Sequence, residues 1–455
     1  MVESNQYLHG VWKGPWYFIG AMICASAGLG ALWYFPSAAG GNVGLVSLLF
    51  AVFLVLVSWP LLVTEVMLGR RGRQSAINGL RYLVRESQQR DYWRAIGWLG
   101  TLAGVLMVSW FSLLAVWAGD YFWDMTSGVL QGQSLRFASE HFAAMESQPR
   151  QALLRCGLFL LLTAAVLAGG VARIGRILRH LVAVLLGLLV LAAGLSVFNG
   201  NWASGYDYLF DMSLVDVDRG QWLKAAATAL TMAFVCIPVG VGAAMTLGAY
   251  LPERPQLAKG SLLVVLVAGL VTFVVALSIH ATLRAEAAQA VLEGQAGSGL
   301  QLLFVSLPVS FSNTSYGLFL GGLFYLFIAL ACWGAAIALL EPAVAWLTES
   351  TRCNRFFSSL IVILVCLGLM PTTFFTLDKG DYGAIEWFCR HCLVPLVALM
   401  VVLFAGYCLR RDLLREMLYD ESRTLFSICY GLLRYILPVA MVIIFSLNIY
   451  LTITT

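Results

Sequence analysis

The chain has 455 residues, of which 60% are hydrophobic and 11% charged, and its formal net charge is +4. With a mean hydropathy of +0.84, this composition is typical of helical membrane proteins with many spans and excludes an ordinary soluble domain. The apolar runs are too long for strands and lack the alternation of an outer-membrane barrel. The small positive charge needs no nucleic acid to explain it, because most of it comes from basic residues in loops on one side.

We predict an all-α polytopic membrane protein formed by a single transmembrane domain (1–455). Its 11 transmembrane helices are expected near residues 14–38, 43–68, 95–124, 152–170, 175–198, 222–250, 259–283, 315–348, 356–376, 383–411 and 427–453. Spans one to five (14–198) and six to ten (222–411) form two five-helix repeats of opposite orientation, because five is odd. The last span (427–453) is an additional helix.

Two spans are interrupted by glycines at corresponding places in the two repeats. The first breaks at Ala27-Gly28-Leu29-Gly30 and the sixth at Pro238-Val239-Gly240-Val241-Gly242. At membrane depth, non-helical backbone is tolerated only where it lines a cavity or is buried in protein. Paired interruptions of this kind point to the binding site of a transporter with a 5+5 inverted repeat. The sequence therefore predicts a membrane carrier.

Basic residues indicate how the chain crosses the membrane. Seven arginines lie between Arg70 and Arg94, after the second span, and the later loops on that side are also basic. The positive-inside rule places the amino terminus in the cytoplasm, and an odd number of spans places the carboxyl terminus outside. We expect a multi-pass protein of the cell's inner (plasma) membrane, without a cleaved signal peptide.

Four motifs, in order along the whole chain, resemble the neurotransmitter:sodium symporter family, whose bacterial members carry amino acids. Ala25–Pro36 is similar to the family's N-A-V-G-L-G-N-x-x-R-F-P, and Pro60–Arg70 to its P-x-x-x-x-E-x-x-x-G-R. Gly240–Tyr250 resembles G-F-G-x-x-x-T-Y-x-S-Y, and Glu341-Pro342 stands where the family has Gln-Pro. The resemblance implies the leucine-transporter fold with broken helices one and six, and sodium symport.

The sodium ligands that this resemblance implies are largely missing. In the first ion site, an Asn, a Thr and a second Asn of the family align with Ala31, Cys236 and Ala268. In the second site, backbone carbonyls would come from Cys24, Ala27 and Ala331, but Gly334 and Ala335 replace a Thr-Ser pair. Sodium requires oxygen ligands. We therefore expect both ion sites to be degenerate and sodium dependence to be weak or absent.

The substrate-binding positions implied by the resemblance are apolar or small. The family's carboxylate-binding Tyr aligns with Phe111, and its aromatic lid aligns with Val235. The full set of candidates is Ala25, Ser26, Gly28, Gly30, Phe111, Val235, Cys236, Pro238, Val239, Gly240 and Ala335. Such a pocket favours an apolar ligand with one polar group, and free N–H groups at the breaks would meet that group. The alternative is a pocket that binds nothing.

The resemblance also implies gates on both sides. On the outside, Tyr34 replaces the family's Arg, while its acidic partner is retained as Asp381. On the cytoplasmic side, Trp12 and Glu349 match gate residues, and His9 stands where an Arg is usual.

Ionisable residues at membrane depth are costly and are functional candidates by default. The coupling candidates are Glu65, Glu341, Arg179 and Arg390. Glu65 is either a buried acid that bridges the broken first and sixth helices or a proton carrier. Arg179, with Arg176 and His180, is a candidate to fill the second ion site. Glu386 and Arg390, spaced i,i+4, form either an internal ion pair or part of the transport machinery.

The function that we predict is secondary active transport of a small amino-acid-like, apolar or amphiphilic metabolite by alternating access. The alternatives are a sodium-independent or proton-coupled carrier, and a transport-inactive relative that acts as a sensor or membrane subunit. No nucleophile–base arrangement, P-loop or dinucleotide motif indicates an enzyme, and Cys389-x-x-Cys392 lacks the second ligand pair of a metal site. The expected partners are the lipid bilayer and a small-molecule substrate, with no nucleic acid and no cofactor; the oligomeric state is not predicted.

Overall fold

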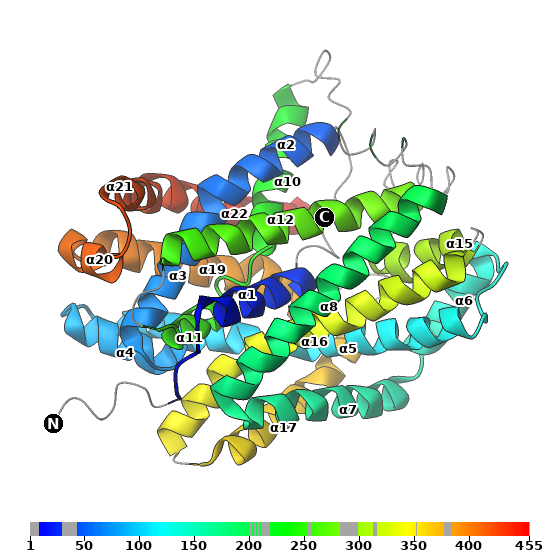
Figure 1. Cartoon of the computed structure of the whole chain (residues 1–455), viewed down its shortest axis with the longest axis horizontal. Helices are drawn as coiled ribbons and strands as arrows, with labels where there is room; N and C mark the ends of the chain where they lie inside the picture. The colour runs from blue at the N-terminus through cyan, green and yellow to red at the C-terminus, as the bar shows by residue number, and fades with distance from the viewer. Residues whose placement is uncertain are drawn as a thin grey trace.

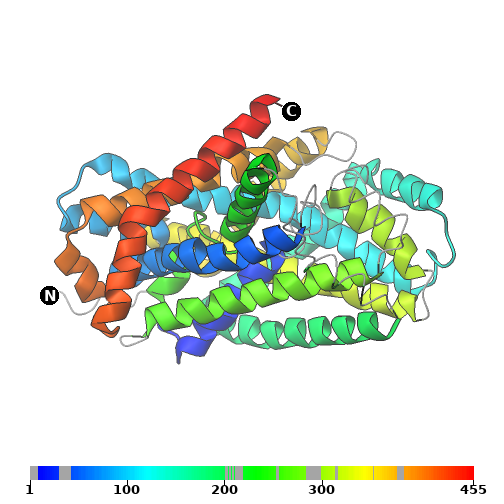
Figure 2. The ribbon, with the colours of Figure 1, turned by 90° about the horizontal axis from the view of Figure 1, so that it is seen from above.

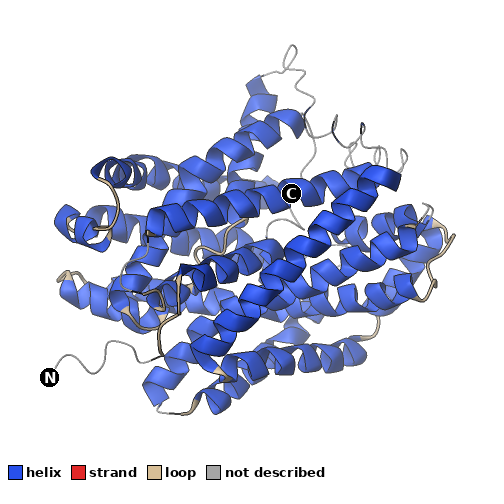
Figure 3. Ribbon diagram, viewed as in Figure 1, coloured by secondary structure: helices blue, strands red, loops and turns tan. Residues whose placement is uncertain are grey.

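The structure is a computed structural model. It describes residues 9–29, 43–199, 203, 206, 210, 219–252, 256–282, 299–312, 316–351, 353–376 and 384–454. Within these residues every regular element is a helix (Figure 3). Of the predicted first break, Ala27, Gly28 and Leu29 are still helical and belong to the end of the first helix (Pro15–Leu29), whereas Gly30 lies outside the described residues. The first-ion-site residue Ala31 and the outer gate residues Tyr34 and Asp381 also lie outside them.

Helices occupy the position of every predicted span. In chain order they are α1 (Pro15–Leu29), α2 (Val43–Phe53) with α3 (Trp59–Gly72), α5 (Ala95–Thr126), α7 (Pro149–Ala168), α8 (Gly170–Asn199), α10 (Arg219–Val235) with α11 (Ala243–Ala249), α12 (Leu257–Thr282), α16 (Gly317–Thr351), α17 (Arg355–Thr376), α18 (Ala384–Phe388) with α19 (Val394–Leu403), and α21 (Arg423–Gly431) with α22 (Leu437–Thr454). Short π-helical segments join three of these pairs: η2 (Leu54–Ser58), η5 (Cys389–Leu393) and η7 (Leu432–Ile436). A fourth, η6 (Phe404–Cys408), follows α19.

Among the described residues, nine helical segments are long and apolar enough to cross a membrane. They coincide with all the predicted spans except the first and the sixth. Those two are the spans with predicted breaks, and their described helices are shorter, with 15 residues in α1 and 17 in α10.

Several shorter helices lie outside the predicted spans: α4 (Ala76–Glu86), η3 (Asp91–Arg94), α6 (Leu135–Glu146), α14 (Gly299–Gln301) with η4 (Leu302–Ser306) and α15 (Leu307–Ser312), and α20 (Arg411–Met417). A search for span-length apolar runs misses such helices because they are short or amphipathic. In α4, for example, Ser75 caps the first turn and only one face, which carries Leu80 and Leu83, is buried.

Helix α1 lies inside the bundle. Figure 1 shows α1 near the centre, and it packs against α8, α12 and α16. The long helices α5 and α16 form the most extensive helix pair, while α10 packs on α2, and α11 on α3. The view from above places the last helix, α22, on the outside of the bundle (Figure 2).

Glycine allows the close approach of α3 and α11. A β-carbon at Gly69 would lie 1.8 Å from the carbonyl oxygen of Met245. Two helices can approach this closely only where one carries no side chain. This contact fixes α11 against α3 and so fixes one side of the break in the sixth span.

Candidate functional site

The break in the sixth span lies between the end of α10 at Val235 and the start of α11 at Ala243. Gly240 and Gly242 both have positive φ angles, +74° and +70°, which favour glycine. A β-carbon at Gly240 would also lie 2.6 Å from the carbonyl oxygen of Val394. The chain therefore leaves the helix here in a conformation that requires glycine, pressed against α19.

Glu65 on α3 holds this break in place. Its side chain is fully buried, and its Oε1 accepts a hydrogen bond of 2.6 Å from the backbone N–H of Gly240. The carboxylate thereby satisfies a backbone donor that the interrupted helix leaves unpaired. This contact agrees with the prediction that Glu65 bridges the broken helices, as far as the sixth span is concerned. The chain beyond Leu29, where the first span was predicted to break, lies outside the described residues.

A pocket lies beside the break. Its walls come from α5, from the end of α10 with the break, and from the tenth span, with the lining residues Met107, Trp110, Phe111, Phe234, Val235, Ile237, Pro238, Val239, Val241, Glu386, Arg390 and Val394. The rings of Trp110 and Phe111 meet edge to face, with centroids 5.1 Å apart. The pocket is thus apolar and aromatic except at Glu386 and Arg390.

Four of the predicted substrate-binding residues, Phe111, Val235, Pro238 and Val239, line this pocket. Other candidates have different surroundings. The Ser26 hydroxyl donates to the carbonyl of Met22 in its own helix, the Cys236 thiol lies 3.4 Å from the Thr272 hydroxyl, and the Gly240 N–H is taken by Glu65. Ala25 and Ala335 are buried, and Gly28 belongs to the last turn of α1, but none of the three is among the described lining residues.

At the first predicted ion site, the structure describes Cys236 and Ala268. The Thr272 hydroxyl donates to the carbonyl of Ala268, 2.9 Å away, and also contacts the Cys236 sulfur. The family motifs do not identify Thr272, because this residue lies one helical turn after Ala268, the position that matches the family's ligand. This hydroxyl is already engaged in its own helix.

At the second predicted ion site, α1, α8 and α16 pack closely. The Cys24 thiol donates to the carbonyl of Leu178 over 3.3 Å. A β-carbon at Gly334 would lie 3.0 Å from Cys24 Cβ and 3.1 Å from Leu181 Cδ2. Ala27, Ala331 and Ala335 are also buried here. An apolar leucine therefore stands beside the position where the family's hydroxyl pair would be.

The interpretation that Arg179 fills this ion site is wrong. Its side chain is exposed, and its guanidinium lies over the ring of Tyr17, 5.2 Å from the centroid. Arg176 and His180 are exposed as well. Because helix α8 turns Leu178 and Leu181 inward, the neighbouring basic residues face outward.

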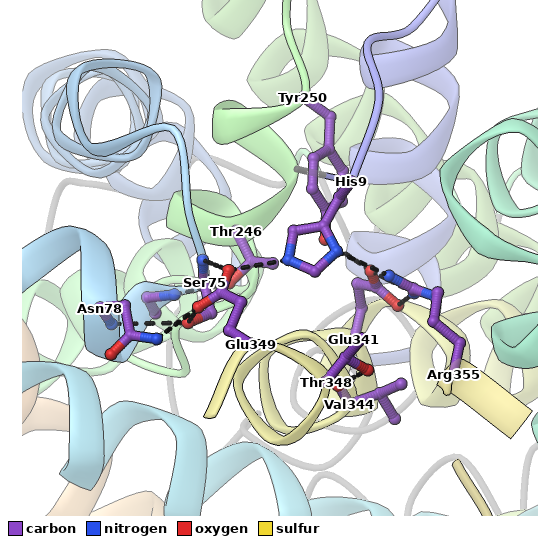
Figure 4. A network of polar contacts seen from close by, with 11 residues as sticks. His9, Ser75, Asn78, Thr246, Tyr250, Glu341, Val344, Thr348, Glu349 and Arg355 are labelled. Carbon is purple, nitrogen blue, oxygen red and sulfur yellow. Dashed lines mark hydrogen bonds and ion pairs between the residues drawn. The ribbon is translucent and has the colours of Figure 1, made fainter. Parts of the chain in front are cut away.

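A second polar centre lies at the end of α16, where Glu349 joins three segments (Figure 4). Its carboxylate lies 2.7 Å from His9 Nε2 and accepts hydrogen bonds from Ser75 N (2.7 Å), Ser75 Oγ (2.6 Å) and Asn78 Nδ2 (2.6 Å). The predicted gate residues His9 and Glu349 are therefore in direct contact. Trp12, the third of them, is buried; its backbone N–H donates to the carbonyl of Tyr250 over 2.9 Å, and its indole N–H donates to the carbonyl of Val171 over 3.2 Å.

Glu341 lies beside this centre and is paired with Arg355 at the start of α17. The Arg355 Nη2 donates to both carboxylate oxygens, at 2.7 and 2.6 Å, and the Tyr250 hydroxyl donates to Oε1 over 2.5 Å. Arg355 Nη1 also lies 3.2 Å from His9 Nδ1 (Figure 4). His9 thus connects Glu349 with the ion pair of Glu341 and Arg355. Arg355 was not predicted, because its role appears only when α17 folds back beside α16.

In the tenth span, Arg390 Nε lies 3.3 Å from Glu386 Oε1, as the i,i+4 spacing predicts. Both side chains are largely buried, with 16% and 10% of their surfaces exposed. The pair lies in the wall of the apolar pocket. Sequence reasoning identified the ion pair but did not place it at the pocket.

The model of the Sodium:neurotransmitter symporter family matches residues 146–454, about two thirds of the chain. The chain belongs to the sodium:neurotransmitter symporter family. It is therefore a multi-pass membrane protein and a secondary transporter, which acts on a small molecule in a lipid bilayer.

Relatives of this symporter extend over nearly its whole length. It is 29% identical to the sodium-dependent transporter YhdH of Bacillus subtilis (strain 168), covering 95% of this chain and 96% of the relative. It is 22% identical to a sodium-dependent transporter of Haemophilus influenzae, covering 99% and 100%. The crystal structure of MhsT in complex with L-phenylalanine has a TM-score of 0.83 at 23% identity and covers 96% of this chain and 99% of MhsT. The last comparison confirms the leucine-transporter-like fold.

Proposed function

We propose that the chain transports a small apolar or amphiphilic, amino-acid-like metabolite by alternating access around the break at Pro238–Gly242, with weak or no dependence on sodium. The observation that carries this proposal is the apolar, aromatic pocket beside that break, which Phe111, Val235 and Val239 help to line. The bound L-phenylalanine of MhsT, which has a similar fold, supports an aromatic amino acid as a first test ligand.

The choice of coupling ion depends on the side chains at the former ion sites. The relatives in Bacillus subtilis and Haemophilus influenzae are named sodium-dependent, which favours sodium coupling. Against it, Cys236, Ala268, Gly334 and Ala335 offer no side-chain oxygen, and Leu181 packs beside Gly334. Because sodium binds through oxygen ligands, the side chains at these positions argue against a sodium site of the family's type.

The contacts around Glu349 are consistent with a closed cytoplasmic gate. His9, Ser75 and Asn78 tie the amino-terminal segment and the start of α4 to the end of α16. The basic loops support a cytoplasmic location for these segments. Alternating access would require these hydrogen bonds to break in the state that is open to the cytoplasm.

A thermal-shift screen of the purified chain tests the proposal. Amino acids, amines and indole-like compounds are added in sodium and in choline buffers. Equal stabilisation in both buffers is the expected result. Stabilisation only in sodium would contradict sodium independence, and a ligand whose effect grows at low pH would favour proton coupling. No stabilisation by any compound would favour a transport-inactive sensor or membrane subunit.

A further inference from the structure

The wall of the apolar pocket contains one charged pair, Glu386 and Arg390, on the tenth span. Glu386 is 8% exposed, so its carboxylate is removed from bulk water. A buried carboxylate requires hydrogen-bond donors for both oxygens to offset the loss of water. The donors around this carboxylate therefore indicate what the pocket is suited to bind.

The two oxygens of Glu386 differ in their partners. Oε1 meets Arg390 Nε at 3.3 Å, which is a long contact for a charged pair. Oε2 is buried and has no hydrogen-bond partner among the described residues. Glu386 Oε2 therefore lacks a hydrogen-bond donor, and a cationic donor would suit it best because the carboxylate is charged.

The rest of the pocket suits the remainder of such a ligand. Trp110, Phe111 and Phe234 provide aromatic surfaces, and Met107 and Val239 provide further apolar surface. Aromatic faces attract a nearby cation as well as apolar groups. An ammonium group at Glu386 with an aromatic or branched apolar body between α5 and the break would satisfy both parts of the pocket.

We propose that Glu386 is a specificity-determining residue that binds the ammonium group of a primary amine ligand, with Arg390 as the residue that positions its carboxylate. The ligand class is a small primary amine with an apolar, preferably aromatic, body. This inference rests on the proposed function only in treating the pocket as the substrate site. An ammonium group supplies three N–H donors, so it can donate a hydrogen bond to Glu386 Oε2 while Arg390 remains paired with Oε1.

The test is calorimetric binding to the purified chain with three probes of similar size: 2-phenylethylamine, the neutral 2-phenylethanol and the anionic 3-phenylpropionate. The wild-type chain is expected to bind the amine about 10- to 100-fold more tightly than the alcohol, because a hydrogen bond to a charged group replaces a neutral one. Tighter binding of 3-phenylpropionate than of the amine would overturn the proposal, since Arg390 would then dominate recognition. Absence of amine binding would also overturn it.

The variant Glu386→Gln keeps the shape of the side chain and removes its charge. Its preference for the amine over the alcohol is expected to fall to within about twofold, while affinity for the alcohol changes little. The matched control is Glu140→Gln, which removes the acid of an exposed i,i+4 pair with Arg136 and should retain the wild-type preference. If Glu386→Gln does not fold, the double variant Glu386→Gln with Arg390→Met removes both charges and is measured in its place. A full amine preference in either variant would refute the assignment.

These measurements are separate from transport. Amine binding that depends on Glu386, without uptake into liposomes, would support this inference and contradict the proposed function. Uptake of an apolar metabolite with no effect of Glu386→Gln on ligand preference would do the reverse.

Discussion

The ion pair between Arg355 and Glu341 gives a quantitative prediction about the polar centre beside the end of α16. Glu341 is fully buried, and the Arg355 side chain is 15% exposed. Arg355 Nη2 donates to both oxygens of the carboxylate. In the variant Arg355→Met, the carboxylate keeps only the hydrogen bond from the Tyr250 hydroxyl.

Removing one partner of a buried pair leaves a charge without compensation, which costs about 3–5 kcal/mol of unfolding free energy. Replacing both partners costs much less, because no buried charge remains. We therefore expect the double variant Arg355→Met with Glu341→Gln to recover most of the loss. The matched control is Arg410→Met, which removes an exposed pair with Asp412 at 3.3 Å and should cost about 0–1 kcal/mol.

The measurement is equilibrium unfolding of the four proteins in mixed detergent micelles with increasing sodium dodecyl sulfate. A loss in Arg355→Met no larger than that in Arg410→Met would refute the reasoning. A double variant as unstable as Arg355→Met would also refute it, because the destabilisation would then come from lost packing rather than from the unpaired carboxylate.

Three further predictions follow from contacts elsewhere in the bundle. Glu65→Leu should cost about 1–3 kcal/mol more unfolding free energy than Glu65→Gln, because only the glutamine keeps an acceptor for the Gly240 N–H; equal losses in the same unfolding assay would remove this role. Gly334→Ala should cost about 1–3 kcal/mol by overpacking against Cys24 and Leu181, whereas Gly368→Ala, with nothing within 4 Å, should cost less than about 1 kcal/mol; similar values would show that the contact at Gly334 is loose. His141, outside the predicted spans, has a raised pKa because Asp124 accepts its hydrogen bond at 2.9 Å. The stability that this pair provides is fully present below the unfolded histidine pKa of about 6.5 and is lost as pH rises through the higher folded value. The melting-temperature difference between wild type and His141→Gln should therefore be larger near pH ~5.5 than near pH ~8; a difference independent of pH would contradict this.

The contacts at Gly334 also change how an ion site could be restored. Sequence alignment suggests Ala31→Asn, Gly334→Thr and Ala335→Ser together. In the variant Gly334→Thr, the β-carbon would already lie only 3.0 Å from Cys24 Cβ and 3.1 Å from Leu181 Cδ2, before the rest of the side chain is counted. We expect sodium-dependent stability only if Leu181→Ala is added to these changes.

Much of the fold could be predicted because hydrophobicity over the length of a bilayer is a strong signal, and glycines mark the break in the sixth span. The helices at 43–72, 257–282 and 317–351 lie close to their predicted bounds. Short amphipathic helices such as α4 and α6 were missed, because their signal is a buried stripe that depends on the neighbours they pack against.

The candidate site was predicted less completely. Phe111, Val235 and Val239 follow from motif positions and do line the pocket. Arg355 and Thr272 have no motif, and their roles depend on which helices lie side by side. The prediction for Arg179 was wrong for the same reason, because the sequence does not determine which face of α8 packs against α1.

We have proposed that this family member carries an apolar, amine-containing metabolite without requiring sodium. Uptake of labelled L-phenylalanine into liposomes that contain the purified chain, with sodium or choline outside, tests this proposal. We predict uptake above that of protein-free liposomes, at rates in the two buffers that agree within about twofold, a difference of less than ~0.5 kcal/mol. Uptake that occurs only in sodium, or no uptake in either buffer, would contradict the claim.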